Sequence, residues 1–143
     1  MDALEIIGPH TTVSLPREGV SSIPAKVDTG AYTSSIWASD IQRDDDALSF
    51  VLFGEGSPFY TGKRITVTNF TQSRVKSSFG ASEVRYKITL DVIIDGVSFT
   101  TQFTLANRHR NRFPILVGRQ ALRGRFVVDV SRREALYIQK KEA

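Results

Sequence analysis

The feature that most constrains the fold is a pair of alternating segments joined by Asp95-Gly96. Apolar side chains stand at every second position of residues 84–94 and at most alternate positions of residues 97–105. Such alternation is typical of strands with one buried face, and Asp-Gly favours a two-residue hairpin turn with positive φ. The turn would give both strands one continuous apolar face. The predicted facing pairs are Ile94 with Val97, Val92 with Phe99, and Ile88 with Phe103.

The remainder of the chain also predicts β-structure. Short apolar runs are broken by Gly, Pro, Asp and Ser, and long helical periodicity is absent. With 143 residues the chain can bury a substantial core, so we expect one all-β domain over residues 1–143. The expected strands are Leu4–Ile7, Thr11–Leu15, Ile23–Val27, Leu48–Phe53, Arg64–Val67, Arg74–Ser78, Val84–Ile94, Val97–Leu105, Ile115–Val117, Phe126–Val130 and Leu136–Gln139.

Cysteine usage and hydropathy restrict the class of protein. The sequence contains no cysteine, which excludes disulfides, thiolate metal sites and cysteine nucleophiles. No apolar run approaches the ~18 residues that a transmembrane helix needs. The N-terminus lacks the basic and apolar regions of a signal peptide. We therefore expect a cytoplasmic protein that does not interact with a membrane.

The charge is unevenly distributed. From Arg108 to the end there are 10 basic and 3 acidic residues, a balance of +7, whereas residues 1–107 carry 9 basic and 12 acidic residues, a balance of −3. A basic end favours an acidic peptide, a nucleic acid or an anionic surface as partner. Scattered, solvated arginines would produce the same count.

The chemistry of the chain centres on Asp28-Thr29-Gly30. An apolar run over residues 23–27 leads into this acid, hydroxyl and glycine, and a second apolar segment begins at Ile36-Trp37. A strand would thus deliver one carboxylate to a tight turn. Three residues recur by chance, and an aspartate that only caps the amides of its turn would look the same. The continuation through Ala31 and Thr33-Ser34-Ser35 extends the pattern of the aspartic peptidases, Asp-Thr-Gly-Ala/Ser-x-Ser/Thr.

A second motif follows about ninety residues later. Ile115-Leu116-Val117-Gly118-Arg119 precedes Gln120-Ala121-Leu122. This order of apolar residues, glycine and a short helix that ends in leucine resembles the second hallmark of retroviral-type peptidases, in which the strand supports the catalytic loop. Together with Leu15-Pro16 and the run to Asp129, the motifs are similar to one bacterial family. It is the retropepsin-like family long labelled "putative ATP-dependent zinc protease" and associated with an ATP-grasp glutamate ligase.

The resemblance implies a fold and a set of roles. The fold would be a closed retropepsin-like (acid protease) β-barrel with one short helix near the C-terminus. Asp28 would be catalytic, Thr29 would hold two active-site loops together, and Gly30 would let substrate approach the backbone. Ser34 or Ser35 would orient the aspartates, unless they are simply polar turn residues. The implied substrate-binding residues are Ala31, Ser34, Ser35, Gly80 and Arg119, of which Arg119 would bind substrate or brace the loop.

The family's older label does not fit these residues. The chain has two histidines, His10 and His109, and no His-Glu-x-x-His motif, so a three-histidine site is excluded. A site of mixed histidine and carboxylate ligands stays open at this point. It also lacks the Gly-x-x-x-x-Gly-Lys-Ser/Thr phosphate loop. We therefore expect neither zinc nor ATP, and no other cofactor.

An aspartic mechanism needs two carboxylates, one ionised and one protonated, that share a proton. The chain has one Asp-Thr-Gly. Three other acids of the same chain could in principle supply the second carboxylate: Asp91, Asp95 and Asp129. Asp91 falls on the polar face of a strand, Asp95 belongs to the hairpin turn, and no Thr-Gly follows Asp129. We therefore expect a homodimer, in which a second copy supplies the other Asp28 across a two-fold axis.

The predicted activity is endopeptidase cleavage of peptides, with acidic, glutamate-rich tails as a candidate substrate. A closing hairpin between Gln72 and Tyr86, with its tip near Gly80, would cover the cleft. Two other functions stay open at this point. One is a peptide-binding module of the same fold without catalysis. The other is a basic barrel that binds nucleic acid, although its aromatic residues fall mainly on apolar strand faces.

Overall fold

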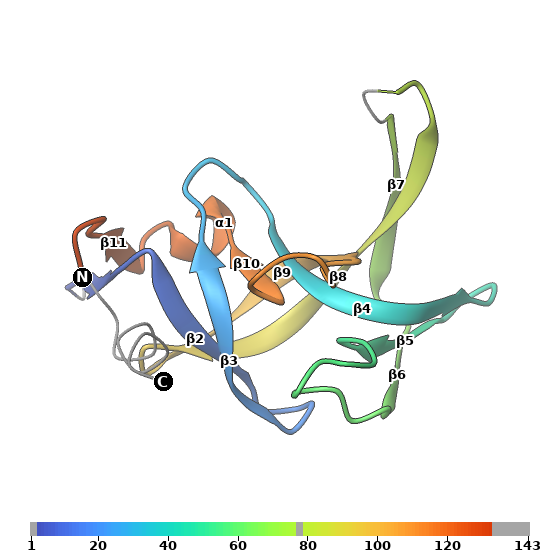
Figure 1. Ribbon diagram of the computed structural model, residues 1–143, viewed down its shortest axis with the longest axis horizontal. Helices are drawn as coiled ribbons and strands as arrows, with labels where there is room; N and C mark the ends of the chain where they lie inside the picture. The colour runs from blue at the N-terminus through green and yellow to red at the C-terminus, as the bar shows by residue number, and fades with distance from the viewer. Residues whose placement is uncertain (1–2, 77–78, 133–143) are drawn as a thin grey trace.

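The computed structural model describes residues 3–76 and 79–132, which form a β-barrel with three extensions (Figure 1). The elements are β1 (Glu5–Ile7), β2 (His10–Leu15), β3 (Val20–Val27), β4 (Ser34–Arg43), β5 (Leu48–Leu52), β6 (Arg64–Val67), β7 (Phe70–Lys76), β8 (Ser82–Ile94), β9 (Val97–Ala106), β10 (Ile115–Val117), α1 (Arg119–Leu122) and β11 (Phe126–Val128).

Six strands close the barrel. Their order is β10-β3-β2-β8-β9-β4, and β4 returns to pair with β10. The sheet is mixed, because β10 runs parallel to β3 and β9 runs parallel to β4, while the other neighbours are antiparallel. This arrangement confirms the expected all-β closed barrel with one short helix near the C-terminus.

The β8–β9 hairpin has the predicted turn and register. Asp95 and Gly96 both adopt positive φ, 49° and 77°, as a two-residue turn of this type requires. The three predicted pairs, Ile94 with Val97, Val92 with Phe99, and Ile88 with Phe103, all face one another.

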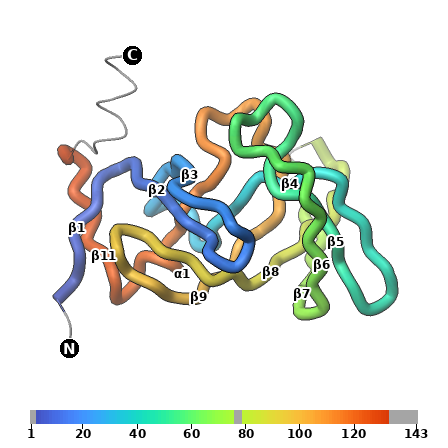
Figure 2. Tube along the Cα trace, turned by 90° about the horizontal axis from the view of Figure 1, so that it is seen from below, coloured from blue at the N-terminus to red at the C-terminus, as the bar shows by residue number. Residues whose placement is uncertain are grey.

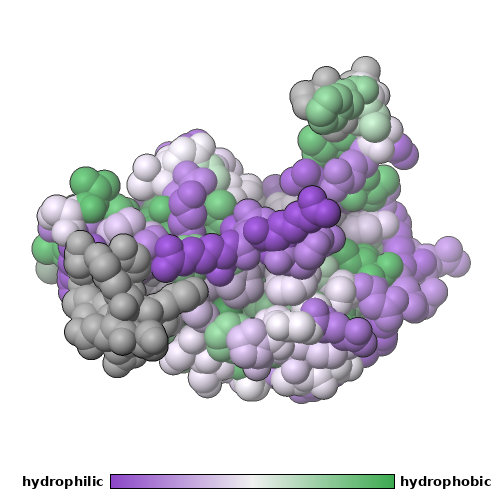
Figure 3. Space-filling view, viewed as in Figure 1, coloured by the Kyte–Doolittle hydropathy of each residue, from purple (hydrophilic) through white to green (hydrophobic). Residues whose placement is uncertain are grey.

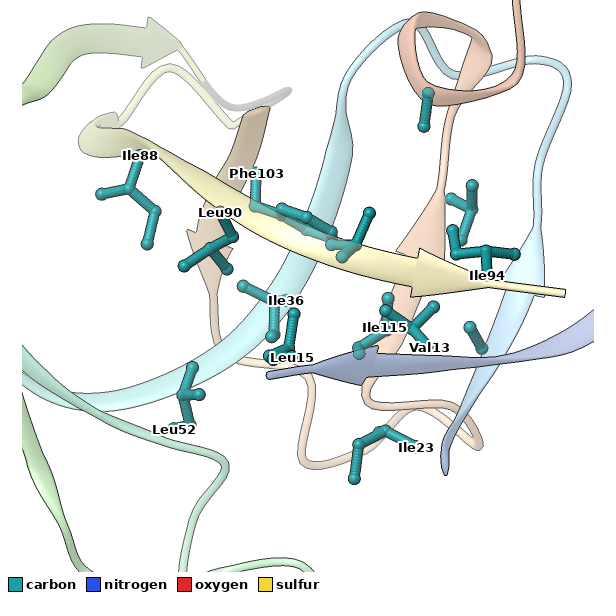
Figure 4. Close-up of a cluster of buried hydrophobic side chains, with 14 of the residues drawn as sticks. Val13, Leu15, Ile23, Ile36, Leu52, Ile88, Leu90, Ile94, Phe103 and Ile115 are labelled. Atoms are coloured by element: carbon teal, nitrogen blue, oxygen red, sulfur yellow. The ribbon is translucent and has the colours of Figure 1, made fainter. Parts of the chain in front are cut away.

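The core lies inside the barrel. Figure 4 shows branched aliphatic side chains from several strands pointing toward one another around Phe103. Phe103, Ile36 and Ile115 are at most 1% exposed. The short central strand β10 therefore contributes its buried residues to the same cluster as the long hairpin strands.

Three extensions leave the barrel. β5 and β6 continue the sheet outward from β4. β7 pairs along β8 beyond the barrel and makes a projecting hairpin (Figure 1). β1 and β11 lie side by side as a small parallel pair (Figure 2).

The main element that the sequence did not predict is β4. Its buried face carries Ser34, Ile36 and Ala38, and two of these residues are too small or polar to produce an apolar alternation. Other differences are at boundaries: β7 begins at Phe70 rather than Arg74, and β11 ends at Val128. The predicted strand Leu136–Gln139 and the end of Arg74–Ser78 lie outside the described residues.

The core predicts a contrast between two phenylalanines. Phe103→Ala should lower the free energy of unfolding by about 3–5 kcal/mol, because a buried ring leaves a cavity. Phe79→Ala is the matched control, since Phe79 is 94% exposed, and should cost about 0.5 kcal/mol or less. Urea denaturation measures both values; equal losses would contradict the placement of the core.

Candidate active site

Asp28 lies directly after β3, at the start of the loop that leads to β4. Its backbone N–H donates to the Val117 carbonyl at 2.9 Å, and its own carbonyl accepts from the Ala31 N–H at 3.3 Å. One carboxylate oxygen, Oδ1, accepts the Gly30 N–H at 2.9 Å. These bonds hold the carboxylate in a fixed turn, and Asp28 remains half-buried rather than enclosed.

The turn from β10 into α1 clamps this loop from the side. The Arg119 N–H donates to the Ala31 carbonyl at 2.8 Å, and the Gln120 N–H donates to the Tyr32 carbonyl at 2.9 Å. The Arg119 guanidinium also donates to the Thr29 carbonyl at 3.0 Å. The second sequence motif therefore lies against the first, and Arg119 braces the loop through its side chain and backbone together.

A buried hydrogen bond fixes the far end of the loop. The Ser34 hydroxyl accepts the Gly118 N–H at 3.0 Å, and Ser34 is 0% exposed. A Cβ on Gly118 would lie 2.8 Å from the Tyr32 carbonyl oxygen and 2.9 Å from that of Ala31, so only glycine allows this close approach. Ser34 thus positions the loop from inside, with its side chain buried away from the surface.

The tip of the loop faces outward. Thr29 and Gly30 are exposed, and Tyr32 is 50% exposed beneath the Arg119 guanidinium. A Cβ on Gly30 would lie 3.2 Å from the Asp28 Oδ1, so the absence of a side chain keeps space beside the carboxylate. The exposed tip is the surface through which another molecule could reach Asp28.

A basic residue that the sequence analysis did not single out lies near the carboxylate. Arg108 follows β9 and donates from Nε to the Phe113 carbonyl at 3.0 Å and from Nη1 to the Ser35 hydroxyl at 3.4 Å. Burial lowers the pKa of the Arg108 guanidinium, and the nearby Asp28 carboxylate acts in the opposite direction. The guanidinium stays charged, because arginine titrates far above neutral pH.

Arg108 was missed because its position depends on β4. The parallel pairing of β9 with β4 sets Ser35 against Thr104, and this pairing carries the segment after β9 toward the loop that holds Asp28. In the sequence, Arg108 belongs to a polar, basic connection. Without β4, nothing in that connection distinguishes Arg108 from Arg110 or Arg112.

The structure brings most of the predicted site residues together and leaves one apart. Asp28, Thr29, Gly30, Ala31, Ser34, Ser35 and Arg119 belong to the loop and its clamp. Gly80 instead lies at the tip of the β7–β8 hairpin. The ribbon of Figure 1 and the tube of Figure 2 both show this hairpin apart from the loop that carries Asp28. The hairpin exposes Val75 and Phe79, and Figure 3 shows apolar surface at this end.

Two negative findings apply to residues 3–76 and 79–132. No group of three or more histidine, cysteine, aspartate or glutamate side chains is arranged to hold a metal ion. In the same ranges, no helix has the length and apolarity needed to cross a membrane.

The hydrogen bond between Ser34 and Gly118 predicts that the neighbouring residues Ser34 and Ser35 contribute very differently to the free energy of unfolding. Ser34→Ala should cost about 1–3 kcal/mol of unfolding free energy, because the buried Gly118 N–H loses its acceptor. Ser35→Ala should cost about 0.5 kcal/mol or less, since the Ser35 hydroxyl accepts a long, 3.4 Å bond from Arg108 at a partly exposed position. Thermal or urea unfolding compares them; a neutral Ser34→Ala would rule out the clamp as a stabilising contact.

Comparison with known proteins shows a family and several relatives that this chain resembles over most of its length. A family model described as "Retropepsin-like aspartic endopeptidase RimB" matches residues 6–142. A "Probable alpha-L-glutamate ligase" of Desulfotalea psychrophila is 34% identical over 146 residues, which cover 99% of this chain and 31% of that protein. A protein of the same name from Parasynechococcus marenigrum is 33% identical over 132 residues, or 87% of this chain and 28% of that protein. The chain thus spans about a third of the length of these relatives.

A solved structure supports the fold. The crystal structure of Lpg0085 from Legionella pneumophila, a protein described as having unknown function, superimposes with a TM-score of 0.67 at 22% identity and covers 93% of this chain and 98% of that one. The match over residues 6–142 and the two ligase relatives confirm the resemblance drawn from the motifs. The chain belongs to the RimB-like family of retropepsin-like aspartic endopeptidases.

Proposed function

We propose that this protein is an aspartic endopeptidase in which the Asp28 carboxylates of two copies activate one water molecule. The observation that carries the proposal is the clamped, outward-facing loop, in which Asp28 is held by backbone bonds while Thr29 and Gly30 are exposed. An immobile carboxylate on an accessible loop suits a catalytic base, because proton transfer needs a group already in position.

The environment of the other candidate acids supports a second copy as the source of the second carboxylate. Asp91 pairs with Arg17 at 3.1 Å and accepts the Thr100 hydroxyl at 2.7 Å. Asp129 accepts the Ser131 hydroxyl at 2.6 Å, and Asp95 occupies the hairpin turn. Each of these acids has a local structural role, whereas the Asp28 loop presents its tip to solvent.

The chemistry follows from the pairing. Two carboxylates about 3 Å apart cannot both ionise easily, so the pair holds one proton, as is known for aspartic proteases. The ionised carboxylate takes a proton from water as the water oxygen attacks the peptide carbonyl carbon. The protonated carboxylate donates to the carbonyl oxygen, and a proton then passes to the leaving amine as the C–N bond breaks.

The β7–β8 hairpin is the candidate for the closing element. It projects from the barrel, has the positive-φ Gly80 at its tip, and exposes Phe79 there. Closure over a peptide would bury Phe79 and exclude water from the cleft.

An acidic, glutamate-rich peptide is the substrate that the charges favour. Lys26 lies two residues before Asp28 on the outward side of β3, and Arg108 lies near the same carboxylate. Both cations would attract acidic side chains beside the cleaved bond. The relatives are named as glutamate ligases, which supports a substrate that carries glutamate.

The first prediction concerns Asp28 itself. Asp28→Asn should lower the rate of peptide hydrolysis by about 10³-fold or more, because the amide cannot act as a base, while circular dichroism stays unchanged. Asp129→Asn and Asp91→Asn are the controls and should retain activity. Activity that persists in Asp28→Asn, or that disappears with a chelator, would exclude the aspartic mechanism.

The second prediction concerns the pairing. A tenfold excess of inactive Asp28→Asn protein should reduce the activity of the unmodified protein by about tenfold, because most unmodified chains would then sit in mixed pairs. Bovine albumin at the same concentration is the control for crowding. If the excess of Asp28→Asn leaves the activity of the unmodified protein unchanged, each chain works alone and the pairing is excluded.

The third prediction concerns charge. Lys26→Gln should lower the preference for a Glu-rich peptide over its Gln-rich counterpart by about two- to fivefold in kcat/KM, as loss of a partly exposed ion pair does. Arg17→Gln removes the same charge from a site 79% exposed beside Asp91 and should leave the preference unchanged. No preference in the unmodified protein would exclude acidic substrates.

A further inference from the structure

A concave site lies along the strands that lead to Asp28 and Gly118, before both residues in the chain. It is a pocket of about 490 Å³, lined chiefly by His10, Pro24, Trp37, Phe59, His109 and Phe113. Pro24 lies four residues before Asp28 on β3, and Pro114, also in its wall, lies four residues before Gly118. Because β3 and β10 are parallel, both strands lead from the pocket toward the Asp28 loop.

Five aromatic or imidazole rings contribute to the wall of the pocket. His10 stacks on Phe113 with centroids 4.7 Å apart, and His109 lies 6.4 Å from Trp37. The rings of the pocket wall include the single tryptophan of the chain and both of its histidines. None of them has a part in the hydrolytic chemistry proposed above.

The position of Trp37 is defined closely. A Cβ on Gly54 would lie 2.6 Å from Cζ2 of the indole, so the loop after β5 packs its backbone against the ring edge. The backbone N–H of Trp37 donates to the Pro114 carbonyl at 2.9 Å. The indole edge therefore packs on the loop after β5, and the backbone that carries it is bonded to the segment before β10, which suits a preformed site.

One continuous strand face joins the pocket to Asp28. The outward residues of β3 are Pro24 and Lys26, which alternate with the buried Ile23, Ala25 and Val27. On β10, Leu116 lies beside Lys26 on one side and Ser35 on the other. At ~3.3 Å per residue, the four residues from Pro24 to Asp28 span roughly 13 Å, the length of about four residues of an extended peptide.

We propose that this pocket binds an aromatic side chain of the peptide substrate, about four residues from the bond that Asp28 cleaves. The inference rests on the proposed function and adds an anchor to it. Stacked rings and prolines favour a flat apolar group, since aromatic pairs gain energy beyond the area that they bury. A pocket that fixes a remote side chain would set the register of the peptide at Asp28.

The charges along this path favour acidic residues between the anchor and the cleaved bond. Lys26 and Arg108 lie between the pocket and Asp28, and Arg112 lies at the pocket with its guanidinium 5.4 Å from the Phe113 ring. Glu55 is the acidic residue in the wall. The preferred ligand is therefore a peptide with acidic residues followed or preceded by one aromatic residue.

The test uses the full chain with Asp28→Asn, so that binding is measured without cleavage. The probes are acetyl-Phe-Glu-Glu-Glu-Glu-Phe-amide, which offers an aromatic residue in either direction, and the same peptide with alanine in place of both phenylalanines. Trp37 is the only tryptophan in the sequence, so its fluorescence reports on the pocket. The phenylalanine peptide should shift the emission and bind about tenfold more tightly, as burial of one ring predicts.

Variants of the wall locate the binding. His109 lies at an exposed position beside Trp37. His109→Ala should lower the affinity for the phenylalanine peptide by about three- to tenfold and leave the affinity for the alanine peptide unchanged. Tyr60→Ala is the matched control, because Tyr60 lies on the same loop as Phe59 but not in the pocket wall. Equal affinity of the two peptides, or an unchanged affinity in His109→Ala, would overturn the proposal. If the unmodified protein fails to cleave while the aromatic preference holds, only the catalytic proposal falls.

Discussion

The arrangement of the site depends on one buried contact, the hydrogen bond from the Gly118 N–H to the Ser34 hydroxyl. It joins the turn after β10 to the start of β4, and the backbone bonds from Arg119 and Gln120 to the loop lie beside it. Because Gly118 has no space for a Cβ, the two motifs meet at backbone distance. Asp28 is thereby held by the barrel itself.

Closure of the barrel gives this contact its rigidity. β10 has three residues, yet it pairs with β3 on one side and with β4 on the other. Its buried residues, Ile115 and Val117, are both 0% exposed. A strand this short would not persist alone, so the apolar core holds the strand, and the strand holds the loop that carries Asp28. Stability of the core and geometry of the site are therefore coupled.

Much of this could be predicted from the sequence, and the limits have physical causes. The β8–β9 hairpin was predictable because its turn chemistry and its alternation agree. The meeting of the two motifs followed from family resemblance. β4 was not predictable, because a buried serine and alanine carry little hydropathic signal. The position of Arg108 near the Asp28 carboxylate depends on β4 and on its parallel partner β9. The pocket around Trp37 depends on the same strands, so both features could be found only in the tertiary structure.

The central claim is that two copies of Asp28 form one site. Calorimetric titration with a peptide analogue whose cleaved bond is replaced by a hydroxyethylene group tests it directly, since such analogues mimic the tetrahedral transition state and bind at the paired carboxylates. We expect one analogue to bind for every two chains, and we expect Asp28→Asn to abolish tight binding. One analogue bound per chain would show that each subunit holds a complete site, and would contradict the account.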